Sequence, residues 1–503
     1  MLTGRNLNLP QVIAVARCKA KVSISSCAIK RMNASRAVVE KVVKEGRIVY
    51  GINTGFGKNA TVTIPSDQLI KLQENILVSH AVGTGKPLPE DAVRALMLMT
   101  LNKFATGYSG ISPRIAVTLA EMLNKGVLPY IPEKGSLGAS GDLAPLSHLG
   151  LLMTGHPSSE AIRVSASGEI TKINGVIALR QAGIKPIKLL YKDGLAMING
   201  TTFMTGLLSL ALYDSMVLAD SADRIAAMTM EALKSTTQPF DKQIHAARPH
   251  PGQIKSAANI RKAVRGTEMM IHNTVQDAYS IRCVPQAHGA ARDVIEHVQE
   301  ILEREINSGT DNPLVFEKTG QILSGGNFQG TPLALAADNL TSALTVLGNI
   351  SERRTYRLLD AKLNNGLPMF LTPEPGLNNG LMMYQYSAAA LALENAGMPR
   401  ASALSLPTCA GQEDYVSNGA NAVRNCATVA ENVFNILGIE MIAAAQALDL
   451  RGGADSAGKI TRITHQMVRK YIPYLSRDRI AAFILIRDAV ALLKRRELFN
   501  KTI

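Results

Sequence analysis

Hydrophobic and polar positions along the chain recur mostly with the spacing of α-helices. Leu69, Leu72 and Ile76 fall on one helical face. They predict a helix over residues 66–82, with Ser66 as its capping residue. The same pattern, with proline and glycine as boundary signals, predicts further helices. These cover residues 89–106, 113–125, 143–154, 203–233, 286–307, 331–362, 381–395, 416–448 and 479–496.

Several of these helices are apolar on more than one face. Residues 433–448, for example, include only three polar side chains. Helices of this kind are buried inside a bundle or an oligomer interface. Short strands are expected near 160–174 and 313–323, where Val, Ile and turn residues gather. We therefore expect a mainly α-helical protein. Residues 1–198 form a smaller, loop-rich N-terminal region, and residues 199–503 form a long-helix bundle with C-terminal helices.

Composition supports this fold class and indicates a compartment. Of the 503 residues, 46% are hydrophobic but only 4% are aromatic, so aliphatic side chains and methionine must fill the core. The five cysteines are odd in number and lack Cys-x-x-Cys spacing, as expected of reduced thiols in the cytoplasm. The apolar patch 12–16 is too short for a signal peptide. The uncharged stretch 375–393 contains proline and amide side chains, so we expect no membrane span.

The formal net charge of +14 raises nucleic-acid binding as an alternative. The basic residues are spread along the chain and accompany no known nucleic-acid-binding signature. A solvated basic surface that attracts anionic substrates is the favoured interpretation. We also expect no metal, because His245 and His250 do not share one helix face and no His-Glu-x-x-His motif occurs.

The polar motifs fall in the breaks between the expected helices. Loops on a rigid scaffold are where catalytic groups concentrate. The motifs occupy residues 50–57, 135–148, 199–201, 276–282, 324–328 and 411–414.

One of these motifs contains the tripeptide Ala139-Ser140-Gly141. In a tight bend, the amide nitrogen of Gly141 can attack the carbonyl of Ala139, and loss of water closes a five-membered ring. Loss of a second water turns Ser140 into an exocyclic alkene. Glycine suits this chemistry because it reaches backbone conformations closed to other residues. Two alternatives remain for the tripeptide alone, a surface turn and an anion-binding glycine nest. No phosphate-loop spacing follows it.

Taken together, the motifs resemble the aromatic amino acid ammonia-lyase family, in the family's order, from about residue 45 through 460. The resemblance implies a mainly helical homotetramer whose active sites combine loops from three subunits. It also implies a 4-methylidene-imidazol-5-one formed from Ala139, Ser140 and Gly141, with no metal and no nucleotide. Such an enzyme removes ammonia and a β-proton from a small-molecule L-amino acid.

The resemblance assigns catalytic roles to three further residues. Tyr50 matches the catalytic tyrosine and lies among glycines, as expected of a mobile lid. A tyrosine acting as base needs a lowered pKa, which nearby positive groups can provide. Glu413 is a second candidate base, and Tyr279 matches a residue near the electrophile. For Tyr50 the alternative is a structural role in a glycine-rich turn.

The resemblance also assigns substrate-binding roles. Arg282 matches the arginine that holds the substrate carboxylate, since its planar fork suits a bidentate pair. Asn199 matches the asparagine that holds substrate and ring, while Gln276 and Phe328 match residues beside the electrophile. The alternatives are a structural salt bridge for Arg282, a turn at Asn199, and core packing for Phe328.

Ser79-His80 and Glu413 lie where the family selects the substrate's ring, and both resemble the histidine-specific members, which convert L-histidine to urocanate. His80 can hydrogen-bond an imidazole, and Glu413 can pair with an imidazole nitrogen. Several positions depart from the family pattern and leave the exact amino acid open. These are Thr202, Phe203, Gln329 and Tyr415, together with Lys58 and Asn59, which stand where the histidine-specific members carry apolar lid residues. A lyase or 2,3-aminomutase acting on another aromatic or modified amino acid, and a non-catalytic nucleic-acid-binding relative, stay open as alternatives.

Overall fold

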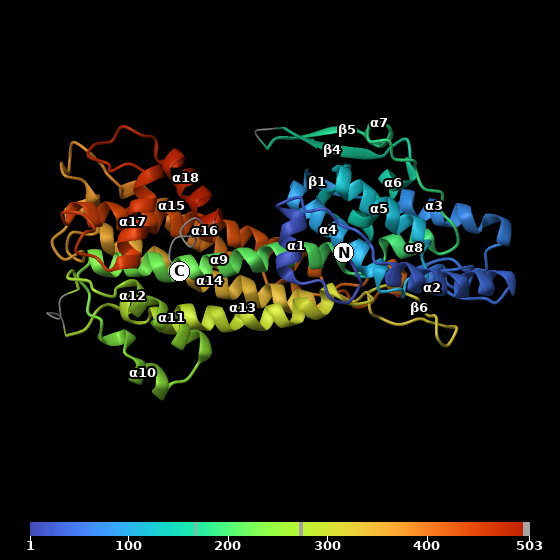
Figure 1. The fold of residues 1–503 in the computed structure, drawn as a ribbon, viewed down its shortest axis with the longest axis horizontal. Helices are drawn as coiled ribbons and strands as arrows, with labels where there is room; N and C mark the ends of the chain where they lie inside the picture. The colour runs from blue at the N-terminus through green and yellow to red at the C-terminus, as the bar shows by residue number, and fades with distance from the viewer. Residues whose placement is uncertain (166–167, 271–274, 496–503) are drawn as a thin grey trace. The chain divides into compact units, whose positions relative to one another are not determined.

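A computed structural model describes residues 1–165, 168–270 and 275–495, and α-helices dominate it (Figure 1). The chain forms two compact units. Unit 1 comprises Met1–Ala211, Gln299–Asp338 and Arg400–Arg424, and unit 2 comprises Leu212–Val298, Asn339–Pro399 and Asn425–Ile503. The units are therefore discontinuous in sequence, whereas the regions expected from the motifs are contiguous. The boundary falls inside four long helices, α9 (Thr202–Ala232), α13 (Val284–Ile306), α14 (Thr331–Leu359) and α16 (Gly419–Leu450).

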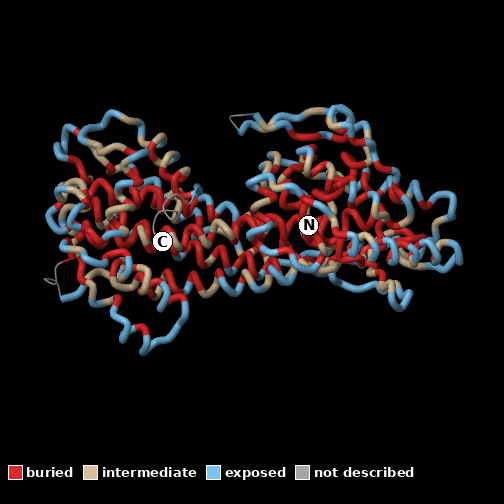
Figure 2. Tube along the Cα trace, in the orientation of Figure 1, coloured by how far each residue is buried: buried red, intermediate tan, exposed pale blue. Residues whose placement is uncertain are grey.

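The helix α4 is buried from Ala92 to Ala105 and contacts α1, α2 and α5. The helices α3, α6 and α8 contact one another. Figure 2 shows that long buried stretches follow these helices, while exposed positions gather in the connections. The helices contained in unit 1 are α1 (Leu9–Ala16), α2 (Ser26–Lys44), α3 (Leu69–His80), α4 (Glu90–Ala105), α5 (Pro113–Lys125), α6 (Leu143–Thr154), α7 (Gly175–Gln181) and α8 (Asp193–Ile198).

The strands described for the chain all lie in unit 1 and form small antiparallel sheets. The strands expected near 160–174 and 313–323 are confirmed, whereas β1, β2 and β3 were not predicted. The sheets pair β1 (Thr84–Pro87) with β3 (Pro132–Lys134), join β2 (Leu128–Pro129), β4 (Glu160–Val164) and β5 (Ile170–Asn174), and pair β6 (Leu314–Phe316) with β7 (Gln321–Leu323).

Unit 2 contains most of the length of the four long helices, together with shorter ones. The shorter helices are α10 (Lys242–Ala247), α11 (Pro251–Ala263), α12 (Tyr279–Arg282), α15 (Met382–Gly397), α17 (Lys459–Tyr471) and α18 (Ala482–Lys494). Single 3-10 turns complete the two units. These are η1 (Gly57–Asn59), η2 (Ser66–Gln68), η3 (Gln238–Phe240), η4 (Met369–Leu371), η5 (Ala401–Ala403) and η6 (Cys409–Gly411).

A buried ionic network joins the long helices within unit 2. Arg354 on α14 donates to both oxygens of Glu440 on α16, at 2.5 and 2.7 Å. Glu440 also accepts from Thr229 on α9 at 2.8 Å, and His288 on α13 lies 3.4 Å from the Arg354 guanidinium. Removing one member would leave an uncompensated buried charge, so the network fixes the register of these helices.

The three longest apolar helices are used for internal packing. By length and composition alone, α9, α14 and α16 are each able to cross a membrane. However, 83%, 67% and 83% of their most apolar windows are buried inside the protein. This burial accounts for the apolar character that the sequence shows on more than one helix face.

The helix predictions hold apart from details at their ends. The helices α5 and α6 have the predicted bounds. Ser66 is the first residue of η2 and Pro65 is the capping residue, so the predicted capping role of Ser66 is wrong. The helix expected over 479–496 is α18, Ala482–Lys494, and residue 496 lies outside the described residues.

Candidate active site

A cavity of about 630 Å³ lies within unit 1. Five of the expected site residues line it, and they come from widely separated parts of the chain. They are Tyr50, His80, Ser140, Asn199 and Glu413. The cavity lies where several helices end. His80 is the last residue of α3, Asn199 caps the end of α8, and α6 begins just after the tripeptide.

The backbone at Gly141 fits only glycine. Its φ is +76°, and a Cβ there would lie 2.2 Å from the carbonyl oxygen of Gly200. The close approach arises because Gly141 and Gly200 form a parallel bridge, in which the Asp142 amide donates to the Gly200 carbonyl at 2.8 Å. A side chain at Gly141 would therefore meet backbone that has no room to move. The fold therefore places a glycine-only backbone conformation at the end of the tripeptide.

The hydroxyl of Ser140 lies against a carboxylate. Ser140 Oγ donates to Glu413 Oε1 at 2.5 Å, and Thr408 Oγ1 donates to Glu413 Oε2 at 2.8 Å. Ser140 and Glu413 are 273 positions apart in the sequence, so no local sequence pattern predicts their contact. The contact holds the Ser140 hydroxyl beside a group that can exchange a proton with it.

Asp142, which directly follows the tripeptide, is a site residue that sequence reasoning missed. Its carboxylate is fully buried and accepts from the backbone amides of Phe203 and Met204 at 3.1 and 3.0 Å, at the start of α9. Ser136 Oγ donates to the other oxygen at 3.2 Å. Burial raises the pKa of Asp142 to about 7, and the hydrogen bonds oppose that shift. An acidic residue next to the tripeptide was the available signal.

Tyr50 stands in the glycine-rich loop and faces the cavity. Its Oη accepts a hydrogen bond from the amide of Gly57 at 3.2 Å. Burial raises the pKa of Tyr50, with smaller contributions from Cys409 and Glu413, so the lowered pKa expected for a base is not found in the single chain. Desolvation is the main reason, and no lysine or arginine in the described lining of this cavity offsets it.

His80 presents its ring at the end of α3. Its Nδ1 lies 2.9 Å from Ser79 Oγ, and burial lowers the pKa of the imidazole, although Glu413 opposes the shift. Near neutral pH the ring is therefore uncharged, and the nitrogen that does not face Ser79 is left for another hydrogen-bonding group.

Asn199 follows directly on α8 in an extended conformation, with φ −82° and ψ 138°. Its side chain lines the cavity and is 5% exposed. Within the part of the chain that the structure describes, its Oδ1 accepts no hydrogen bond. An unpaired buried acceptor is costly, so this atom is available to a donor that enters the cavity.

The remaining expected residues are not part of this lining. Gln276, Tyr279 and Arg282 belong to unit 2, and Phe328 lies half-buried in the loop before α14. Tyr279 is 70% exposed, and the Arg282 guanidinium lies over its ring, 4.6 Å from the ring centre. Arg282 Nε has no partner among the described residues. Within unit 1, the chain thus brings Ser140 of the tripeptide together with His80 and Glu413, whereas Arg282 belongs to unit 2.

Comparison with known proteins agrees with this geometry. The family model for aromatic amino acid lyases matches residues 7–470. The chain belongs to this family. It is 47% identical over 482 residues to a histidine ammonia-lyase of Treponema denticola, covering 95% of this chain and 94% of the relative.

Solved structures of other aromatic amino acid lyase relatives share the fold. A histidine ammonia-lyase from Trypanosoma cruzi superposes with a TM-score of 0.91 at 39% identity, covering 99% of this chain and 94% of that one. A tyrosine aminomutase from Streptomyces globisporus superposes with a TM-score of 0.94 at 37% identity, and the match covers 99% of this chain and 97% of that one. The chain is accordingly a carbon–nitrogen lyase with a mainly helical fold.

One departure from the family pattern, Asn59, lines the cavity of this aromatic amino acid lyase. Four others, Thr202, Phe203, Gln329 and Tyr415, lie outside the lining. The hydroxyl of Thr202 lies 3.0 Å from that of Thr100 on α4, and Phe203 is buried beside it. Gln329 accepts from the amide and hydroxyl of Thr331 at the start of α14. Tyr415 is 56% exposed. These four substitutions therefore change packing and helix capping around the cavity and leave its lining unchanged.

Proposed function

We propose that this lyase eliminates ammonia from L-histidine to give urocanate. One observation carries the proposal. The cavity joins Ser140 of the cyclising tripeptide with His80 and Glu413, the two residues that suit an imidazole ring. The 47% identity to a histidine ammonia-lyase supports the same substrate.

The residues of the tripeptide fit a methylidene-imidazolone. Gly141 has a positive φ that suits the tight bend proposed for ring closure, and Asn199 Oδ1 is an unpaired acceptor in the same cavity, within the described part of the chain. When formed from Ala139, Ser140 and Gly141, the ring supplies an electrophile that no ordinary side chain offers. The Ser140 hydroxyl must gain a proton to leave as water, and Glu413, 2.5 Å away, is placed to exchange a proton with that oxygen.

His80 and Glu413 recognise the substrate ring in this proposal. The neutral imidazole of His80 can exchange one hydrogen bond with a ring nitrogen of histidine. Glu413 can accept from a substrate N–H and favours its charged form. Apolar side chains from α3 and α6, Leu72, Ile76 and Leu143, bound the cavity and exclude water.

Tyr50 is the residue that we propose as the acceptor of the β-proton. Its hydroxyl lies in the lid loop, but burial raises its pKa. A nearby cation would reverse that shift, since an opposite charge within a few ångströms favours the phenolate. The same cation would bind the substrate carboxylate.

We propose that Arg282 of another copy of the chain provides this cation in a cytoplasmic homotetramer with shared active sites. The cavity lining of unit 1 contains no arginine or lysine, and Arg282 keeps an unpartnered Nε beside the exposed Tyr279. A guanidinium suits bidentate binding of a carboxylate. The five cysteines are all free thiols, in keeping with a reducing compartment.

A substrate panel tests the proposed reaction. The purified protein is incubated with L-histidine, L-phenylalanine, L-tyrosine and a modified histidine, and products are identified by mass spectrometry. We expect urocanate and ammonia from L-histidine, with a kcat/KM for the other amino acids at least about 100-fold lower. A β-amino acid as main product would instead establish an aminomutase, and efficient use of another substrate would refute histidine.

A further inference from the structure

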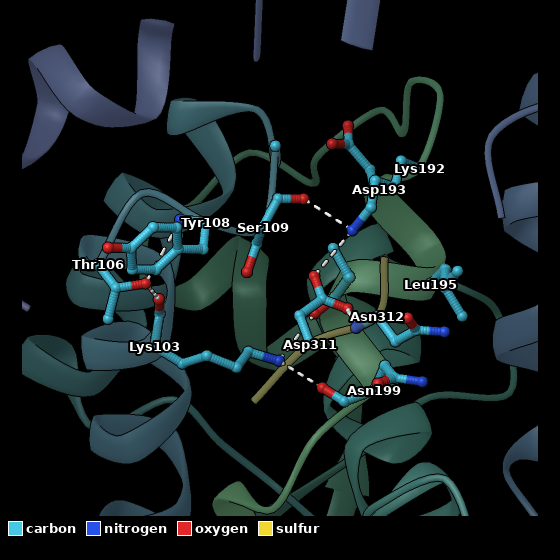
Figure 3. Close-up of polar contacts among 12 residues, drawn as sticks. Lys103, Thr106, Tyr108, Ser109, Lys192, Asp193, Leu195, Asn199, Asp311 and Asn312 are labelled. Atoms are coloured by element: carbon cyan, nitrogen blue, oxygen red, sulfur yellow. Dashed lines mark hydrogen bonds and ion pairs between the residues drawn. The ribbon is translucent and has the colours of Figure 1, made fainter. Parts of the chain in front are cut away.

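Two lysines lie buried behind the cavity, in a cluster drawn in Figure 3. Lys103 on α4 is 2% exposed, and Lys192 at the start of α8 is fully buried. Lysine is almost never fully buried unless it is paired. Lys192 is paired conventionally, because its Nζ lies 2.8 Å from Asp311 Oδ2 and donates to the Ser109 carbonyl at 2.8 Å.

Lys103 has a different set of partners. Its Nζ donates to the carbonyl oxygens of Ala196 and Asn199, at 2.9 and 2.6 Å. The Ala196 carbonyl belongs to the last turn of α8 and the Asn199 carbonyl follows directly after it, where helix carbonyls lack internal partners and the helix dipole is negative. Lys103 therefore caps the end of α8 with a buried positive charge, and Figure 3 shows it reaching toward Asn199.

This cap matters because α8 is very short. Asp193–Ile198 is only six residues long, well under the length at which a helix is stable by itself. Asp193 holds its start by accepting from the amide and hydroxyl of Ser112 at 2.9 and 2.8 Å, whereas the Lys192 side chain makes no capping hydrogen bond to the helix. Lys103 holds its end, and Asn199 is the first residue beyond that end.

Asn199 is joined in turn to the tripeptide. The next residue, Gly200, forms the bridge with Gly141 and accepts from the Asp142 amide at 2.8 Å. A shift of the Asn199 carbonyl thus moves both the Asn199 amide in the cavity and the strand that backs Ser140 and Gly141.

We propose that Lys103 is a positioning residue, which fixes Asn199 and the Ser140–Gly141 backbone through the two carbonyls at the end of α8. The inference rests on the proposed function, because Asn199 is there assigned to the substrate site. Burial lowers the pKa of Lys103 to about 8, with Asp311 and Asp142 opposing the shift and Lys192 adding to it. Lys103 is therefore still mainly protonated at neutral pH.

The test compares Lys103→Met with Lys192→Met, a matched loss of a buried lysine that does not contact Asn199. Both variants are purified as assembled enzyme. Intact mass gives the fraction of chains that have lost two waters, thermal unfolding gives the Tm, and kcat and KM for L-histidine are expressed per ring-bearing chain. Lys103→Arg, which keeps a cation and several donors, serves as the conservative variant.

For Lys103→Met we expect kcat per ring-bearing chain to fall by roughly 100-fold, because a displacement of about 1 Å at a reacting group costs that much. Lys103→Arg should recover part of this loss. Lys192→Met should lower the Tm by at least as much as Lys103→Met does. It should nevertheless keep kcat per ring-bearing chain within about threefold of the wild-type value. Equal kcat for Lys103→Met and the wild type would overturn the proposal, as would an equal fall in both methionine variants.

Two provisions keep the test decisive. If Lys103→Met does not fold, Lys103→Gln takes its place, since the glutamine amide can still donate to one carbonyl. If the wild type does not convert L-histidine, the proposed function fails. The ring-bearing fraction then tests the positioning by itself. A lower fraction in Lys103→Met than in Lys192→Met would support it, and equal fractions would overturn it.

Discussion

Single side chains around the cavity have charge states that burial decides. His80 is a neutral imidazole, Asp142 is a carboxyl whose pKa rises to about 7, and Tyr50 has a raised pKa. In each case desolvation is the largest cause, because few charged groups of the described chain face these residues. The chemistry of the residues follows from where the fold places them more than from their identity.

The ring specificity of His80 leads to a prediction. Replacing His80 by leucine removes a hydrogen-bonding partner for an imidazole and leaves an apolar wall. We expect kcat/KM for L-histidine to fall by about tenfold or more, and activity toward phenylalanine to rise. Steady-state kinetics with both amino acids measure the change.

His148→Leu is the control, because His148 is another partly buried histidine of unit 1 with a lowered pKa and lies outside the cavity lining. Unchanged selectivity in His80→Leu would contradict the assignment of His80 to the substrate ring.

Asp142 predicts a pH dependence of stability. The pKa rises from 3.8 to about 7 on folding, so between these values the folded chain holds a proton that the unfolded chain has released. The contribution of this group therefore falls as the pH rises from about 4 to about 7. We expect the free energy of unfolding of the wild type to lose roughly 1 kcal/mol or more, relative to Asp142→Asn, between pH 5 and pH 7.5.

Denaturant unfolding at several pH values measures this difference. Asp142→Asn also destabilises the protein by an amount that does not depend on pH, because asparagine accepts hydrogen bonds from the Phe203 and Met204 amides less well than a carboxylate does. Only the change in unfolding free energy with pH is therefore compared between the two proteins. Parallel stability curves for the two proteins would show that Asp142 is ionised throughout.

At the scale of elements, the cavity is defined by helix ends held by packed helices. The helices α3, α6 and α8 contact one another, and each has an end beside the cavity. Rigid elements place the residues at their ends accurately. The Tyr50 loop is itself anchored in the core through buried Ile52, but the Tyr50 hydroxyl makes a single described hydrogen bond, from Gly57. This hydroxyl can therefore be removed with little effect on the core.

Tyr50→Phe tests this separation of lid and core. It removes the hydroxyl that would take the β-proton, and we expect kcat to fall by about 100-fold or more. Only one hydrogen bond, at 3.2 Å from Gly57, is lost, so unfolding should be affected by no more than about 1.5 kcal/mol. Kinetics and thermal unfolding are measured together.

Tyr108→Phe, at a tyrosine that packs against Phe316 away from the cavity, is the control. A loss of stability in Tyr50→Phe that accounts for its loss of activity would place Tyr50 in the structural framework instead of the lid.

At the scale of the whole molecule, the site as proposed is incomplete in one chain. Unit 1 holds the tripeptide, His80, Asn199 and Glu413, while Arg282 and Tyr279 belong to unit 2. The requirement for a cation near Tyr50 makes assembly a condition of activity in this proposal. It predicts that copies of the chain complement one another.

The complementation experiment uses two inactive variants. Ser140→Ala cannot form the alkene, and Arg282→Ala cannot bind the carboxylate, so each by itself should retain less than about 1% of the wild-type kcat/KM. Co-expressed in equal amounts, they should form mixed oligomers in which about a quarter of the sites are intact, because each contributing chain is wild type at its position about half the time. Activity that stays at the sum of the two variants would refute a site shared between copies.

The sequence by itself determined most of the long helices and the reactive residue types that the site contains. Apolar spacing, prolines and glycines are local signals, so α5 and α6 were predicted with their observed bounds, and Ala139-Ser140-Gly141 specified its own reactive chemistry. Less apolar or very short helices such as α2 and α8 were missed, because charged residues weaken the periodic signal or the element needs tertiary partners.

The tertiary structure alone decided which of these groups meet and in what charge state. It brought Glu413 onto Ser140 across 273 residues, and Lys103 onto the end of α8. It also raised the pKa of Tyr50, where the sequence predicted a lowered value. The physical reason is that burial and long-range contacts sum over the whole fold, whereas sequence patterns report only what neighbouring residues impose on one another.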